Sequence, residues 1–107
     1  MIDMHIDPDR NTITWKINHN LCFDNIMLIE QKALTFYAQF TKNNQHLTNW
    51  ILLLDANKSI DSAGLSWLLL LQSRANSHHL SLKIIGLNEN KNATELAKAQ
   101  GVYNLLV

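Results

Sequence analysis

WILLLDANKSIDSAGLSWLLLL, residues 50–71, predicts a buried strand, a short loop and the start of a helix. Residues 50–56 form an apolar run that meets an acidic residue, which is typical of a strand buried on both faces in the centre of an α/β sheet. Asp61 and Ser62 come after the loop, and either side chain can cap the first turn of a helix, stabilising it by about 1 kcal/mol. We therefore predict a helix from Ser62 to about Ser77.

Two short strands are predicted before this stretch, at residues 2–6 and 12–18, with turn chemistry at residues 8–11 between them. An amphipathic helix follows from Asp24, its predicted N-cap, to about Thr41. Its apolar stripe, in steps of three and four residues, consists of Ile26, Ile29, Ala33, Phe36 and Phe40.

Further elements are predicted after the central helix. Residues 80–87 predict another strand. A third helix is predicted after it: residues 92–95 (NATE) resemble a capping box at its start, and Gly101 suits the C′ position at its end. Residues 102–107 form a last apolar piece, either a strand or a short helix. The predicted order is β-β-α-β-α-β-α, so we expect one α/β domain over residues 1–107, with a single sheet flanked by helices.

Composition and charge argue against several kinds of partner and location. The 107 residues are 47% hydrophobic, and nine basic residues balance nine acidic ones without a block of like charge. This balance argues against nucleic acid or an anionic membrane surface as the main partner. The longest apolar runs fall far short of the roughly 20 residues that span a bilayer. A single cysteine, Cys22, and an acidic N-terminus unlike a signal peptide favour the cytoplasm.

The sequence contains no catalytic constellation that would indicate an enzyme. It has three glycines and no phosphate-cradling motif, so we expect no nucleotide or other cofactor. The five histidines are scattered without the spacing of zinc ligands, so no metal site is expected. Cys22 lies among apolar residues and is interpreted as a small core residue rather than a nucleophile.

Ser62 admits two interpretations. It is either only an N-cap, or a serine that a partner approaches, because Ala63 and Gly64 leave the first helical turn almost bare. A helix N-terminus favours negative charge, so the fold would tolerate a phosphate on Ser62 that adds nearly two charges to the surface.

The predicted helix also divides into faces. Gly64, Leu68, Leu71 and Ala75 share the face that we assign to the sheet. The flanks or the outside then hold Trp67, Leu69 and Leu70, with Ser66, Ser73 and Arg74. Such a helix is either squeezed between neighbours or presents an apolar patch to another protein. Trp and Arg often dominate the energy of such interfaces.

These residues resemble a known family. LLLDANKSIDSAGLSWLLLL, residues 52–71, resembles the signature of the STAS domain: a buried strand ending in Asp, a short loop, then Asp-Ser-(Ser/Ala/Gly)-Gly-Leu opening a helix. LKIIGLNENKNATELAKAQGVYNLL, residues 82–106, is similar to the C-terminal part of that domain: a strand ending in Gly-Leu, a helix, and a terminal Gly-Val-x-x-Leu-Leu. The resemblance is firm from Trp50 to Val107 and implies a mixed β-sheet flanked by helices.

Two branches of the family imply different partners. In anti-sigma-factor antagonists, the serine matching Ser62 is phosphorylated by an anti-sigma kinase, which binds only the unmodified form. In the MlaB-like branch, a cytoplasmic STAS subunit binds the ATP-binding subunit of the Mla phospholipid ABC transporter, which maintains outer-membrane lipid asymmetry. The residue matching Ser62 and its helix face that ATPase and support its activity.

We favour the MlaB-like branch. Antagonists usually carry Gly-Glu-(Leu/Ile)-Asp after the second strand, whereas residues 17–20 here read INHN, with Asn20 at best replacing the acid. The expectation is a non-catalytic subunit that is peripheral to the inner membrane through its partner. Its predicted partner-binding residues are Asp61, Ser62, Ala63, Gly64, Leu65, Trp67, Leu70 and Arg74.

Overall fold

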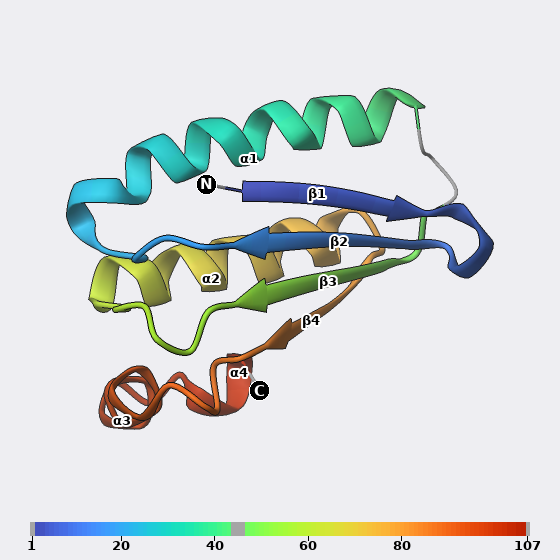
Figure 1. The fold of residues 1–107 in the computed structure, drawn as a ribbon. Coiled ribbons are helices and arrows are strands. Elements are labelled where there is room, and N and C mark those ends of the chain that lie inside the picture. Colours follow the sequence, from blue (N-terminus) through green and yellow to red (C-terminus); the bar gives the residue numbers. More distant parts are fainter. Residues whose placement is uncertain (1, 44–46, 107) are drawn as a thin grey trace.

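The chain folds around a four-stranded mixed sheet with the order β1-β2-β3-β4 (Figure 1). The computed structural model describes residues 2–43 and 47–106. Strands β1 and β2 are antiparallel, and β2, β3 and β4 are parallel. The elements are β1 (Ile2–Asp7), a 3-10 turn η1 (Pro8–Arg10), β2 (Thr12–Ile17), α1 (Phe23–Asn43), β3 (Asn49–Leu54), α2 (Ser62–Ser77), β4 (Ser81–Ile85), α3 (Lys91–Ala99) and α4 (Tyr103–Leu106). This order confirms the predicted α/β class and mixed sheet.

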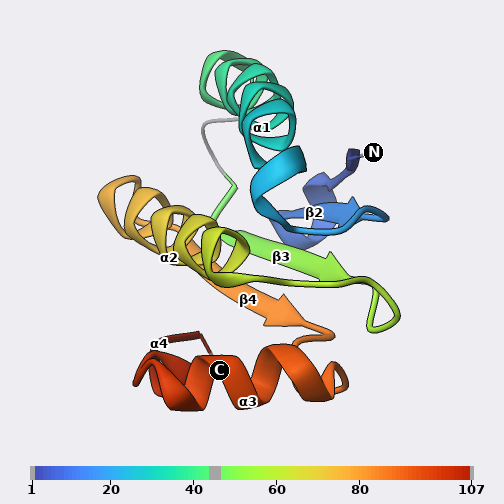
Figure 2. The same ribbon diagram turned by 90° about the vertical axis from the view of Figure 1, so that its left-hand side faces the viewer.

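The helices α1 and α2 cover the same face of the sheet, and the opposite face carries none of the described helices (Figure 2). Successive right-handed crossovers that move in one direction across a sheet place their helices on one side. In β3, Trp50 and Leu52 are therefore buried, whereas Ile51 and Leu53 are partly exposed on the open face. The prediction that this strand is buried on both faces is wrong.

An aromatic cluster fills the space between α1 and the sheet. The rings of Trp15 and Trp50 lie 4.5 Å apart, edge to face, and the ring of Tyr37 lies 5.7 Å from that of Trp50. The predicted stripe of α1 is confirmed for four residues: Ile29 and Ala33 are buried, and Ile26 and Phe36 pack against the core. The side chain of Phe40 lies outside the described part of the chain.

The N-terminus of α3 differs from the prediction. The helix begins at Lys91 and its N-cap is Asn90, whose Oδ1 accepts from the backbone N–H of Ala93 at 3.1 Å. The predicted capping box at residues 92–95 is wrong, because Asn92 already lies within the first turn of α3 and Asn90 is the cap.

The C-terminus of α3 agrees with the prediction. Gly101 has a φ of 72° and donates to the Lys98 carbonyl, while Val102 donates to that of Ala97. These two bonds form a Schellman motif. The last apolar piece is the short helix α4.

Candidate functional site

The Asp61 carboxylate caps two helices at once. Its Oδ1 accepts from the backbone N–H of Gly64 in the first turn of α2, at 3.0 Å. Its Oδ2 accepts from the backbone N–H of Phe23, the first residue of α1, also at 3.0 Å. Asp61 rather than Ser62 is therefore the N-cap of α2. The predicted N-cap of α1 is wrong, because Asp24 lies within the first turn of that helix.

The environment of Asp61 favours its charged form. Desolvation raises its pKa, but the backbone N–H groups of Phe23, Gly64 and Ala63 together lower it further, so that the pKa lies below its ordinary value of 3.8. The carboxylate is thus ionised at neutral pH and places a negative charge at the N-termini of two helix dipoles, which is favourable.

The loop before α2 pairs with the segment before α1. Leu21 donates its N–H to the Ser59 carbonyl at 2.8 Å, and Asp61 donates its N–H to the Leu21 carbonyl at 3.1 Å. The Asn20 side chain accepts from the Ser59 N–H at 2.9 Å. These bonds hold the beginning of α2 against the beginning of α1.

Gly64 permits the close approach of these segments. A Cβ at this position would lie 2.0 Å from the Leu21 carbonyl oxygen and 2.8 Å from the Leu21 Cβ. Gly64 is therefore buried against Leu21. The expectation that Gly64 exposes the first turn to a partner is wrong. Its role in the structure is to admit the neighbouring backbone.

Ser62 is the exposed residue at this helix start. Its Oγ accepts a hydrogen bond of 2.6 Å from Nε2 of Gln100, the C-cap of α3. Sequence reasoning did not find Gln100, since 38 residues separate it from Ser62 and no local pattern marks it.

The inner face of α2 agrees with the prediction. Gly64, Leu68, Leu71 and Ala75 are all buried in the core. The helix bounds, Ser62–Ser77, also match. On the outer side, the exposed residues include Ser62, Ser66, Leu70 and Ser73.

Two predicted anchors of α2 face α1 instead of solvent. Trp67 is only 4% exposed, and its indole N–H donates to Glu30 Oε1 at 3.4 Å. Arg74 forms a two-pronged ion pair with Glu30, with Nη2 to Oε2 at 2.9 Å and Nη1 to Oε1. Leu65 is buried as well. Trp67 lies on a flank of α2, as predicted, but α1 covers this flank, so the interpretation of a helix squeezed between neighbours holds for Trp67 and that of an exposed anchor does not.

Exposed apolar side chains of α1 continue the outer side of α2. Phe23 is 77% and Met27 73% exposed, and Leu34 shares their helix face. Met27 and Leu34 lie three residues before and four after Glu30, which contacts α2, so they flank this contact. We define the docking surface as Phe23, Met27 and Leu34 of α1 with Ser62, Ser66 and Leu70 of α2.

Helix α2 contributes no unpaired charge to the docking surface. Arg74 is the only charged residue of this 16-residue helix, and Glu30 neutralises it. Depletion of charge together with exposed apolar groups distinguishes the cores of protein interfaces from the rest of a protein surface. The arrangement is suited to binding another protein.

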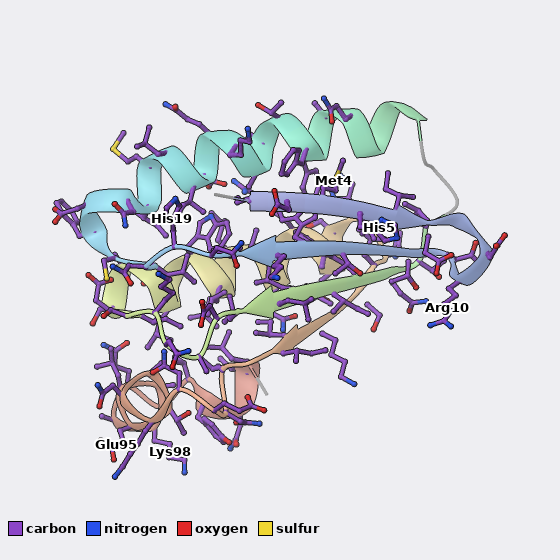
Figure 3. The ribbon with its side chains drawn as sticks, viewed as in Figure 1. Met4, His5, Arg10, His19, Glu95 and Lys98 are labelled. Atoms are coloured by element: carbon purple, nitrogen blue, oxygen red, sulfur yellow. The ribbon has the colours of Figure 1, made fainter. Side chains whose placement is uncertain are left out.

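The most pronounced depressions in the described part of the surface are open to solvent. One of them, about 520 Å³, is a trough between α2 and α4, lined by Leu69, Gln72, Ser73, Asn76, Ser77 and Leu105. Within residues 2–43 and 47–106, no three His, Cys, Asp or Glu side chains form a group that could hold a metal ion. Figure 3 shows His5 and His19 well separated along the sheet.

Comparisons with known proteins do not assign the chain to a family. A scan against protein-family models and a search of curated proteins found no match to this chain. In the part of the chain that the structure describes, no helix combines the length and the apolar character needed to cross a membrane.

Proposed function

We propose that this chain is a non-catalytic STAS subunit that binds the ATP-binding subunit of an Mla-type phospholipid ABC transporter. The observation that supports docking is the uncharged outer side of α2, continued by the exposed Phe23 and Met27 of α1. The identity of the partner rests on the resemblance of residues 52–71 to the STAS signature. The subunit would lie on the cytoplasmic side of the inner membrane, held there by its partner.

The partner would cover the docking surface. Burial of an exposed Phe or Met side chain contributes roughly 1.5–3 kcal/mol, so Phe23 and Met27 would supply much of the affinity. Leu70 would add an apolar contact, and the small serines of α2 would allow the partner to approach closely. Trp67 and Arg74, expected from the sequence to be anchors, would act indirectly by holding α1 and α2 together through Glu30.

The first experiment is a mild-detergent pull-down of the tagged chain from native membranes, with the companions identified by mass spectrometry. We expect an ATP-binding subunit together with its permease. A soluble kinase without a permease would contradict the proposal.

A binding measurement with the captured ATPase then tests the surface. Phe23→Ser combined with Met27→Ser should weaken binding at least tenfold, because two apolar anchors are lost. Leu28→Ser is the matched control, since Leu28 is 57% exposed on the same helix but lies outside the docking surface. Equal loss in both variants would mean that this surface is not the interface.

Ser62→Glu tests the helix start separately. A negative charge beside the Asp61 carboxylate, within an otherwise uncharged contact, should weaken the complex roughly tenfold. The domain should stay folded, because helix N-termini tolerate acidic residues. An unfolded variant, or one with unchanged affinity, would count against a contact at Ser62.

A second candidate function is that of an anti-sigma-factor antagonist, favoured by one observation: the Ser62 hydroxyl is exposed at a helix N-terminus. Against it, Asn20 stands near the place of the usual acid and uses its side-chain oxygen to accept from the Ser59 N–H. Incubation with the cognate kinase and ATP should label Ser62 if this function holds. Absence of label would exclude it.

A further inference from the structure

Ser62 uses only part of its hydrogen-bonding capacity. A hydroxyl carries one hydrogen and two acceptor lone pairs. Gln100 Nε2 donates to the Ser62 oxygen at 2.6 Å. Among the described residues, the Ser62 hydroxyl donates to no acceptor. The unused hydrogen is therefore free to meet a group outside this chain.

Both partners of this bond stand on fixed backbone. Gln100 ends α3, where the Schellman motif at Gly101 and Val102 fixes the chain direction. Ser62 begins α2, whose N-terminus is held by the Asp61 carboxylate. The bond thus joins two rigid helix ends and restricts the rotation of the Ser62 side chain. A group held in this way loses less conformational entropy when it binds.

We infer that Gln100 is a positioning residue, which occupies the acceptor side of Ser62 and presents its O–H as a donor to the docking partner. The group of the partner that meets Ser62 is then an acceptor. A carbonyl oxygen fits better than a carboxylate, because the Asp61 carboxylate next to Ser62 would repel a second negative charge. This inference rests on the proposed docking function.

The test uses the purified chain and the ATP-binding subunit identified in the pull-down, with affinity measured by calorimetry. Gln100→Met keeps the side-chain length but removes the donor, and we expect about three- to tenfold weaker binding. Gln100→Glu replaces the donor by an acceptor that captures the Ser62 hydrogen, so its loss should be at least as large. Glu95→Met, an exposed change elsewhere on α3, is the control and should bind normally.

A double-mutant cycle separates positioning from direct contact. If Gln100 acts through Ser62, Gln100→Met should have no further effect in the Ser62→Ala background. Thermal unfolding of each variant should stay close to that of the wild type. Equal binding of Gln100→Met and wild type, or the same loss in both backgrounds, would overturn this inference alone. A wild-type chain that does not bind the ATPase would overturn the proposed function and this inference with it.

Discussion

The inner and outer faces of α2 belong to one helix but follow different constraints. Gly64, Leu68, Leu71 and Ala75 are buried, and the space left by the sheet and Leu21 limits which side chains fit there. The outer face, with Ser62, Ser66, Leu70 and Ser73, is exposed and meets no such limit within the described part of this chain. The inner face therefore specifies the fold, and the outer face is free to be selected for binding.

Gly64→Ala should have the largest effect on stability, because it disturbs the packing of the inner face of α2. The added Cβ would lie 2.0 Å from the Leu21 carbonyl oxygen, so the first turn of α2 must move away. We expect a loss of about 3 kcal/mol in the free energy of unfolding, measured by urea denaturation. Ser66→Ala on the outer face is the control and should change it by less than about 0.5 kcal/mol. A Gly64→Ala variant as stable as wild type would refute this account of the close approach.

Asp61→Ala should cost about 2 kcal/mol, because one carboxylate caps two helices at about 1 kcal/mol each. The folded-state pKa of Asp61 is lowered, so its ionic contribution is present above the unfolded-state pKa and is lost as the pH falls through the folded value. The stability gap between wild type and variant should be constant at neutral pH and shrink below about pH 4. A gap that widens in acid would contradict the shared cap.

Glu30→Gln should cost up to about 1 kcal/mol, since the pair with Arg74 is partly exposed. The variant also leaves an unpaired cation beside the docking surface. Urea denaturation at low and high salt is the measurement, and the difference from wild type should diminish as salt screens the pair. A difference that does not depend on salt would indicate that packing of Trp67, rather than charge, holds α1 against α2.

Leu70→Ser should have the smallest effect on stability, below about 0.5 kcal/mol, because Leu70 is 40% exposed. Binding to the ATP-binding subunit should nevertheless fall several-fold, since an apolar contact is lost. A substitution on the outer face would thus lower affinity but not stability, whereas Gly64→Ala on the inner face lowers stability. A variant that loses stability but not affinity would place Leu70 in the fold rather than in the interface.

Local pattern was enough to predict much of α2 from the sequence. The period of this helix, its bounds and its buried face depend on residues within one segment. What local pattern missed for α2 are its contacts with distant segments: Trp67 and Arg74 face Glu30 of α1, and Gln100 of α3 reaches Ser62. The partial exposure of β3 is likewise a property of the topology, because both crossovers pass over one face. No periodicity within a single helix or strand contains this information.

The carboxylate that α1 and α2 share has a consequence for local opening. Unwinding the first turn of α1 breaks the bond to Phe23, admits water to Asp61 and weakens its hold on Gly64. The two helix ends therefore fray together as one cooperative unit, rather than as two independent termini. A partner that immobilises one of them would slow amide exchange at the other, even where it makes no contact.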